Sequence, residues 1–211
     1  MKIAFLGHGN VGGALAHRMQ QIGRDVTVGA GDLQSDSVKK LLARSPALKV
    51  ALPADAVSRA EIVVLATPFQ ANIEVLTPLK TALAGKILID CTNPVGPGLS
   101  HGLSSKQSGT EMIQQLLPAT RVVKAFSIYG FENFEDSSFP GYGVKPVMMF
   151  CGNDQTAKAA VSELLKQLGW EPLDVGGVEQ ALHLEHMTLL WVRMVRMGGH
   201  SPRTVWAVLS R

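Results

Sequence analysis

Short apolar runs alternate along the chain with stretches in which apolar residues recur at helical spacing. Lys2–Leu6 is an apolar run that ends at Gly7, which is typical of a buried parallel strand. Gly23 is suited to end the helix predicted next, whose apolar positions are Val11, Leu15, Met19 and Ile22. Asp25–Gly29 follows as a second strand. Strand, glycine turn, helix and strand within roughly 30 residues predict one βαβ unit.

The same alternation continues to the end of the chain. Further strands are predicted at Glu61–Ala66, Lys86–Asp90, Arg121–Phe126, Pro146–Cys151 and Glu171–Val175. Further helices are predicted at Ser37–Arg44, Ala71–Leu83 with an interruption at Pro78, Thr110–Leu117, Asp154–Leu168 and Val178–Met197. This alternation predicts an α/β fold, a doubly wound and mainly parallel sheet of the Rossmann type with helices on both faces.

The length of the chain indicates a single domain in two parts. Its 211 residues are enough to bury a sizeable core. Residues 1–126 hold the regular alternation, and residues 127–211 add a small C-terminal α/β extension. Two irregular segments, Pro94–Ser108 and Ser127–Gly143, are expected to be functional loops, since long loops without secondary structure commonly are.

Composition narrows the class of protein. Hydrophobic residues make up 46% of the chain and charged residues 18%, which argues against disorder. The net charge is +3 and the basic residues are scattered, so no nucleic-acid surface is expected. No apolar run approaches the roughly 20 residues of a membrane span, and the first residues leave no room for a signal peptide. Cys91 and Cys151 lack CxxC spacing, and two buried free thiols agree with a cytoplasmic protein.

A glycine-rich turn separates the first strand from the first helix and reads Gly7-His8-Gly9-Asn10-Val11-Gly12. Gly7 permits a tight turn, Gly9 lets the backbone approach a pyrophosphate, and Gly12 lets the helix pack closely on the sheet. The helix N-terminus then offers free N–H groups to phosphates. A glycine turn without a ligand is the alternative. Because the turn follows a strand and opens an amphipathic helix, its context favours a dinucleotide.

The end of the second strand bears on the choice between NADP and NAD. An acidic residue there binds a ribose diol, whereas a basic residue binds a 2′-phosphate. The chain has Gly29 at the usual acidic position, followed by Ala30, Gly31 and Asp32. Basic residues of the next predicted helix are candidates to reach a phosphate, although such residues more often form a solvated face; they are Lys39, Lys40 and Arg44. These residues leave NADP and NAD both open.

Two later strands end in a polar residue followed by proline, at Thr67-Pro68 and Asn93-Pro94. Ligands of open α/β sheets bind outside the carboxyl ends of parallel strands. Prolines that merely end the strands are the alternative. The matching positions favour contact with a ligand, with Thr67 and Asn93 holding the ribose and nicotinamide.

Catalytic side chains are less evident than binding residues. The chain has neither a nucleophile elbow nor a phosphate loop of the GxxxxGK type. His183 and His186, which flank Glu185, lack the i, i+4 spacing of a helical zinc pair, so no metal is expected. A cofactor fold without an acid–base apparatus indicates hydride transfer between two cofactors, in which alignment of donor and acceptor does most of the catalysis.

The order of these segments resembles the coenzyme F420-dependent NADP oxidoreductase family, small reductases that pass hydride between NADP(H) and a deazaflavin. The reductase domain of the six-transmembrane ferric reductases is a relative. The resemblance covers nearly the whole chain. It rests on "KIAFLGHGNVGGALAHRM", "VTVG", "IVVLATP", "LIDCTNP", "VVKAFSIYG", "FCGNDQTAKAAVSELLKQLGWEPLDVG" and "ALHLEHMTLLWVRM".

The resemblance implies three groups of site residues. Phosphate contacts fall on His8, Gly9, Asn10 and Val11, and nicotinamide-side contacts fall near Thr67, Pro68, Asn93 and Pro94. The acceptor side falls around Ala125–Gly130, with Phe126, Ser127, Tyr129 and Gly130 as contacts. The family's basic tripeptide, which grips the 2′-phosphate, is replaced here by Ala30-Gly31-Asp32.

These inferences predict an oxidoreductase that transfers hydride between NAD(P)H and a flavin or deazaflavin. NADP is the implied cofactor with NAD as an alternative, and F420, FMN and FAD are candidate acceptors. The rings of Tyr129, Phe131 and Phe134 are expected to stack on the acceptor. A non-catalytic dinucleotide sensor and a small imine or carbonyl reductase with Tyr129 as proton donor stay open. The apolar C-terminal helix and the Ser127–Gly143 segment suggest a homodimer.

Overall fold

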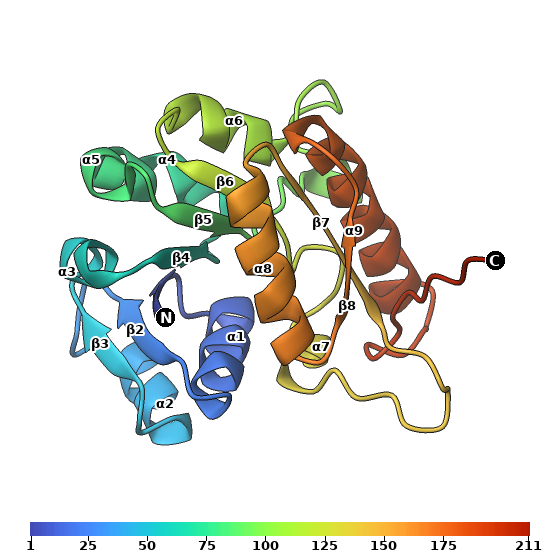
Figure 1. Cartoon of the computed structure of the whole chain (residues 1–211), viewed down its shortest axis with the longest axis horizontal. Coiled ribbons are helices and arrows are strands. Elements are labelled where there is room, and N and C mark those ends of the chain that lie inside the picture. Colours follow the sequence, from blue (N-terminus) through green and yellow to red (C-terminus); the bar gives the residue numbers. More distant parts are fainter.

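The computed structural model describes residues 1–211 and contains one eight-stranded sheet, in the order β3-β2-β1-β4-β5-β6-β7-β8 (Figure 1). Strands β1 to β6 pair in parallel, β7 is antiparallel to β6, and β8 is parallel to β7. The strands are β1 (Lys2–Leu6), β2 (Asp25–Gly29), β3 (Lys49–Ala51), β4 (Ile62–Leu65), β5 (Ile87–Asp90), β6 (Arg121–Lys124), β7 (Val147–Gly152) and β8 (Glu171–Asp174). The predicted α/β fold of the Rossmann type is confirmed.

Helices cover both faces of this sheet. They are α1 (Asn10–Gln21), α2 (Asp36–Arg44), α3 (Pro53–Arg59), α4 (Asn72–Leu76), α5 (Lys80–Leu83), α6 (Gly109–Leu116), α7 (Glu132–Glu135), α8 (Gln155–Gln167) and α9 (Ala181–Arg196). Alternate residues of β1 point to opposite faces, so Ile3 and Phe5 enter one core while Ala4 and Leu6 enter the other. The first core lies under α1, α8 and α9, and the second under α3, α5 and α6.

Local sequence explains where several helices begin and end. Ser35 and Asp154 cap α2 and α8 by accepting from the backbone N–H three residues on. Ser108 opens α6 with a capping box that Glu111 completes. The predicted helix over 71–83 is divided into α4 and α5 by the short 3₁₀ turn Thr77–Leu79, which contains Pro78.

Three short elements lie where the sequence predicts none. The edge strand β3 has three residues, α3 begins at Pro53 and has seven, and α7 has four. None of them is long enough to display a periodic apolar pattern. The predicted strands and longer helices otherwise match the observed ones to within about two residues, apart from the last helix, whose predicted first turn is a 3₁₀ turn.

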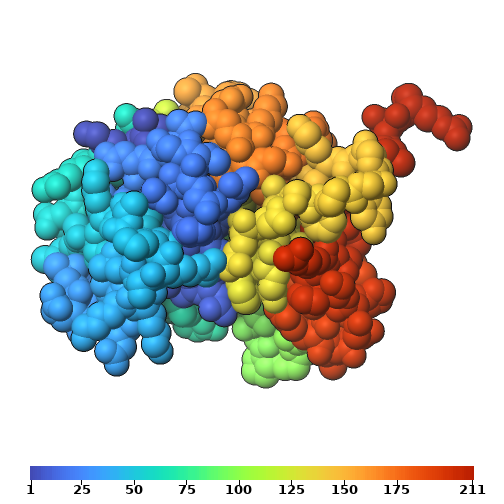
Figure 2. Space-filling view, turned by 90° about the horizontal axis from the view of Figure 1, so that it is seen from below, coloured from blue at the N-terminus to red at the C-terminus, as the bar shows by residue number.

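The C-terminal extension, residues 127–211, packs against residues 1–126. In the space-filling view the segments after the middle of the chain, in yellow to red, lie against the blue and cyan N-terminal segments (Figure 2). The C-terminal tail returns to β7, where the Val147 N–H donates to the Trp206 carbonyl at 2.9 Å, and the last residues project outward. No helix combines the length and apolar character needed to cross a membrane.

Candidate functional site

The glycine turn after β1 is closely packed at its first and third glycines. Gly7 has a φ of +98°, and a Cβ there would lie 2.5 Å from the Ala66 carbonyl oxygen. A Cβ on Gly12 would collide with the carbonyl of Gly7. Neither position accepts a side chain, since one has left-handed backbone and both are closed by neighbouring main chain. This packing brings α1 directly against the carboxyl ends of β1 and β4.

The second glycine of the turn faces open space. A Cβ on Gly9 would meet no atom within 4 Å. Gly9 is also the N-cap of α1 and supplies no capping side chain, and its carbonyl accepts the first helical hydrogen bond, from Gly13 at 2.7 Å. The N–H groups of residues 10–12 therefore have no partner within the helix, and the first turn carries no acidic residue. This donor set fits a pyrophosphate.

At the end of β2 the space around position 29 is tight. A Cβ on Gly29 would lie 3.1 Å from Pro53 Cα and 3.3 Å from the Phe5 carbonyl oxygen, so a side chain there requires its neighbours to shift by a few tenths of an ångström. Gly31 differs, because its Cβ would meet nothing within 4 Å. Asp32 is exposed, and its carboxylate accepts from the Gln34 N–H at 2.8 Å. Ala30 is buried between these residues.

Hydroxyl groups gather beside the glycine turn at the N-terminus of α2. His8 Nε2 lies 2.9 Å from Ser37 Oγ, which lies 3.1 Å from Ser35 Oγ. The other ring nitrogen of His8, Nδ1, is enclosed and has no hydrogen-bond partner in the protein.

Two of the three basic residues of α2 form ion pairs at the surface. Arg44 pairs with Glu135 at 2.8 Å, and Lys39 lies 3.6 Å from Asp36. The third, Lys40, is exposed.

The polar residues after β4 and β5 each bond neighbouring groups of the protein. Thr67 Oγ1 donates to Asn72 Oδ1 at 2.7 Å. Asn93 Nδ2 is 3.4 Å from the Ser127 carbonyl, and its Oδ1 accepts from Thr188 of α9 at 3.0 Å. The C-terminal extension therefore reaches the carboxyl end of β5 directly.

The two prolines that follow these polar residues differ in their surroundings. Pro68 is exposed and precedes the 3₁₀ turn Phe69–Ala71, whereas Pro94 is buried and its carbonyl accepts from the Gly102 N–H at 2.5 Å. Each proline ends its strand, while the residue before it supplies the polar group.

A group of buried charges lies next to these residues, and the sequence analysis did not identify it. Lys124 Nζ is 3.5 Å from Asp90 Oδ2 and 3.3 Å from Glu185 Oε1, and all three side chains are at most 1% exposed. Glu185 also accepts from His101 at 2.8 Å and from the Gly109 N–H at 3.0 Å. No three His, Cys, Asp or Glu side chains are grouped so as to hold a metal ion. We call Asp90, Lys124 and Glu185 the buried charge cluster.

The electrostatics of this cluster hold Lys124 protonated. Burial alone would lower the pKa of Lys124, but the charges of Asp90 and Glu185 raise it above its ordinary value. Two features of the sequence could have indicated this cluster: a lysine within the apolar strand "RVVKAF" and an aspartate that ends "KILID". A charge in a buried strand requires a partner.

The aromatic rings of the predicted acceptor segment are not available to stack on a ligand, which corrects that expectation. Tyr129 is 4% exposed and stacks on Trp170, with ring centroids 5.3 Å apart. Phe126 and Phe134 are buried and pack edge to face, and Phe131 packs against the same core. These rings are drawn inward because the extension needs them to fill its core.

The Tyr129 hydroxyl is also engaged, which removes it as a proton donor. It donates to the Val147 carbonyl at 2.6 Å and accepts from the Trp206 N–H at 3.0 Å. Burial raises the pKa of Tyr129 well above its ordinary value.

The backbone next to Tyr129 lies close to Asn93. Phe126 adopts a φ of +55° just before Ser127, whose carbonyl faces Asn93. Gly130 is closed, since a Cβ there would lie 2.5 Å from the Trp191 ring.

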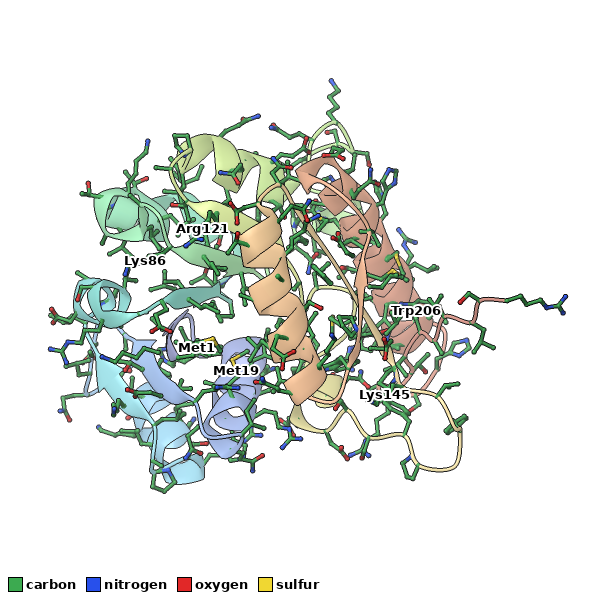
Figure 3. The ribbon with its side chains drawn as sticks, in the orientation of Figure 1. Met1, Met19, Lys86, Arg121, Lys145 and Trp206 are labelled. Carbon is green, nitrogen blue, oxygen red and sulfur yellow. The ribbon has the colours of Figure 1, made fainter.

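A cavity of about 430 Å³ opens farther along the same segment, between Ser127–Gly143 and the C-terminal tail. Phe139 and Tyr142 line it together with the cations Lys145 and Arg203. Tyr142 is 75% exposed. Figure 3 labels Lys145, which lines this cavity, and Trp206, which lies on the C-terminal tail.

Comparisons with known proteins agree with these features. Residues 2–94 match the family described as NADP oxidoreductase, coenzyme F420-dependent. The F420-dependent NADP reductase of Methanothermobacter marburgensis is 30% identical over 212 residues, which cover 92% of each chain. A crystal structure from Arthrobacter sp. FB24, described as a candidate F420-dependent NADP-reductase, is 31% identical, covers 96% of each chain and has a TM-score of 0.86.

Metalloreductases share the same region. The metalloreductase STEAP3 of Rattus norvegicus is 33% identical over 189 residues, which cover 89% of this chain. The match covers only 36% of the metalloreductase, so this chain corresponds to about a third of that protein.

Proposed function

The chain belongs to the coenzyme F420-dependent NADP oxidoreductase family, and on this premise we propose that it transfers hydride between NADPH and a deazaflavin of the F420 type. It is an NAD(P)H-dependent reductase. The observation that carries the finer proposal is the uncapped N-terminus of α1, which follows β1 at the same carboxyl edge of the parallel sheet as Thr67 after β4 and Asn93 after β5. A dinucleotide laid along this edge has its phosphates and its nicotinamide each opposite suitable groups.

Different residues of the site bind different parts of the dinucleotide. The N–H groups from Gly9 to Gly12 hold the pyrophosphate, and His8 lies beside it with a ring nitrogen that has no protein partner. Thr67 and Asn93 orient the ribose and nicotinamide, while Pro68 and Pro94 fix the backbone that presents them. The bound dinucleotide supplies the hydride from its nicotinamide ring. The chain's own residues position this ring.

For the 2′-phosphate we propose the hydroxyl groups at the start of α2. Ser35 and Ser37 lie within 3.1 Å of each other and next to His8, where the first turn of α2 offers unpaired N–H groups. This arrangement takes the place of the family's basic tripeptide. NADP is thus the preferred cofactor, and Gly29 supplies no carboxylate to the ribose diol of NAD.

On the acceptor side we propose that backbone rather than aromatic rings receives the deazaflavin. Phe126, Ser127, Tyr129 and Gly130 contribute their main chain next to Asn93, since the aromatic side chains among them are buried. The nearby relatives are named for F420, and the comparisons give no support to FMN or FAD. The cavity beside Tyr142 is large enough to admit part of an extended acceptor.

Steady-state turnover tests the proposal. The purified protein is mixed with NADPH or NADH and then with F420, FMN or FAD, and the loss of absorbance of each oxidised acceptor is followed. We expect turnover with NADPH and F420 at least tenfold faster than with either flavin. Binding of NADPH without turnover of any acceptor would overturn the proposal and favour the non-catalytic sensor. An imine or carbonyl reductase is disfavoured, because Tyr129 was its candidate proton donor and its hydroxyl is engaged.

A further inference from the structure

The buried charge cluster carries more negative than positive charge. Asp90 accepts from the Thr92 N–H at 2.9 Å, from the Thr110 hydroxyl at 2.7 Å and from Lys124. Every group that faces the Asp90 and Glu185 carboxylates is a donor, so both are ionised. One ammonium against two carboxylates leaves an excess of one negative charge, unless His101 is protonated.

The hydrogen bonds of His101 settle its charge. Its Nδ1 accepts from the Leu103 N–H at 3.3 Å and from the Ser105 N–H at 3.2 Å, so Nδ1 carries no hydrogen. The ring hydrogen is on Nε2, where it is donated to Glu185 at 2.8 Å. His101 is therefore neutral. The ring of His186 stacks on it at 5.2 Å, and His186 is exposed.

A hydrogen-bonded path joins the cluster to Thr67, and one turn of helix α9 joins it to the partner of Asn93. Thr67 bonds Asn72, Asn72 Nδ2 donates to the Thr92 hydroxyl at 2.8 Å, and that hydroxyl donates to Asp90 at 2.7 Å. On the other side Thr188, which bonds Asn93, lies one helical turn after Glu185 on α9. The cluster thus lies directly behind the surface that would face the nicotinamide.

We propose that the buried charge cluster makes the site bind oxidised dinucleotide more tightly than reduced dinucleotide. The nicotinamide ring is positively charged in NADP⁺ and uncharged in NADPH, while the rest of the molecule is the same. A buried negative excess attracts the charged ring and does not affect the neutral one. This inference rests on the proposed function for the placement of the nicotinamide.

The consequence concerns the direction of the reaction. When NADPH gives up a hydride, two electrons and a proton pass to the acceptor and the nicotinamide ring gains one positive charge. A site that favours the positive ring lowers the reduction potential of the bound dinucleotide. The cluster therefore favours NADPH as donor and the second cofactor as acceptor.

Binding of the two oxidation states tests the proposal without any turnover. The dissociation constants of NADP⁺ and NADPH are measured by calorimetry at pH 8 for the wild type and for Glu185→Gln, which removes one charge at nearly constant shape. With unit charges about 10 Å apart at an effective dielectric constant of about 20, we expect roughly tenfold weaker binding of NADP⁺. NADPH binding should change less than about twofold. The ratio of the NADP⁺ dissociation constant to the NADPH dissociation constant should therefore rise in Glu185→Gln. An unchanged ratio would overturn the proposal.

Two further variants separate charge from structure. Thr110→Val removes a hydrogen bond to Asp90 without changing the charge, and it should leave the ratio unchanged. Where Glu185→Gln does not fold, Asp90→Asn makes the same change of charge and should shift the ratio in the same direction. A shift of equal size in Thr110→Val would show that the effect is structural and would overturn the proposal.

The outcomes distinguish this inference from the proposed function. A wild type that binds neither form of the dinucleotide would overturn both. A ratio of the NADP⁺ dissociation constant to the NADPH dissociation constant that rises in Glu185→Gln supports the inference even where no deazaflavin is reduced, which would overturn hydride transfer alone. Turnover of F420 with an unchanged ratio would overturn the inference alone.

Discussion

The two ends of the proposed dinucleotide site are built in opposite ways. At the carboxyl end of β1 the facing groups are main-chain N–H groups, with an open position at Gly9 and no acidic side chain in the first turn of α1. At the carboxyl ends of β5 and β6, charged side chains meet in the interior, where Asp90 and Lys124 are wholly buried. One end is open and uncharged, and the other is closed and charged.

This difference assigns affinity for the dinucleotide to one end and discrimination between its oxidised and reduced forms to the other. The phosphates of a dinucleotide keep their charge in both oxidation states, so N–H groups that hold them contribute equally to both forms. Only a group near the nicotinamide can tell the two forms apart. A fold that puts its free N–H groups at one end and its buried charges at the other can adjust the two properties independently.

Replacing the central cation of the charged end should have the largest effect. Lys124→Met leaves Asp90 and Glu185 buried without their cation, and we expect a loss of about 3–5 kcal/mol in the free energy of unfolding. Urea denaturation measures this loss. Lys166→Met, on the exposed side of α8, is the matched control and should change stability by less than about 0.5 kcal/mol. A loss below about 1 kcal/mol for Lys124→Met would contradict the described ion pairing.

The Lys124→Met variant should also change how the stability of the protein depends on pH. The pKa of Lys124 is raised in the folded protein by Asp90 and Glu185, which outweigh its burial. A raised lysine pKa contributes stability that is fully present below the ordinary lysine value of about 10.4 and is lost as the pH rises through the folded value. Lys124→Met should therefore lose less of its remaining stability than the wild type between neutral and strongly alkaline pH.

At the open end the largest effect is expected from the first glycine. Gly7→Ala puts a Cβ 2.5 Å from the Ala66 carbonyl oxygen on left-handed backbone, so the turn must move away from the end of β4. We expect NADPH to bind at least about 100-fold more weakly, a change of about 2.7 kcal/mol. Gly31→Ala is the control, because that position is open, and it should bind NADPH normally. Normal binding by Gly7→Ala would show that the turn does not hold the phosphates.

The open end was largely predictable from sequence, and the reason is local. The turn from Gly7 to Gly12 follows a strand and opens a helix within one continuous stretch, so spacing alone identifies it. Most strands and longer helices were predictable for the same reason. The edge strand Lys49–Ala51 and the helix Pro53–Arg59 were not, because neither is long enough to show a period.

The charged end was not predictable, because its parts are far apart in the chain. Asp90, Lys124 and Glu185 come from β5, β6 and α9 and meet only after the sheet and the last helix have packed. The orientation of Tyr129 depends in the same way on Trp170 and on the tail at Trp206. Sequence patterns give the face of an element but not the partner that it will meet.

A smaller effect is expected where this chain departs from its family. Gly31→Arg introduces a cation at the open position after β2, close to the proposed 2′-phosphate site. We expect NADPH to bind about tenfold more tightly, a gain of about 1.4 kcal/mol, with NADH unchanged. Fluorescence titration of both nucleotides measures this. Equal gains for NADPH and NADH would place the new cation beside the pyrophosphate instead.

The smallest effect is expected at Ser37, and it bears most directly on how the open end binds phosphate without a cation. Ser37→Ala removes one hydroxyl of the group formed with His8 and Ser35, while the Ser35 cap of α2 stays intact. We expect about threefold weaker binding of NADPH and unchanged binding of NADH. If NADH weakens by the same factor, the hydroxyl acts by holding His8 against the glycine turn. The 2′-phosphate would then rely on the N–H groups of α2 alone.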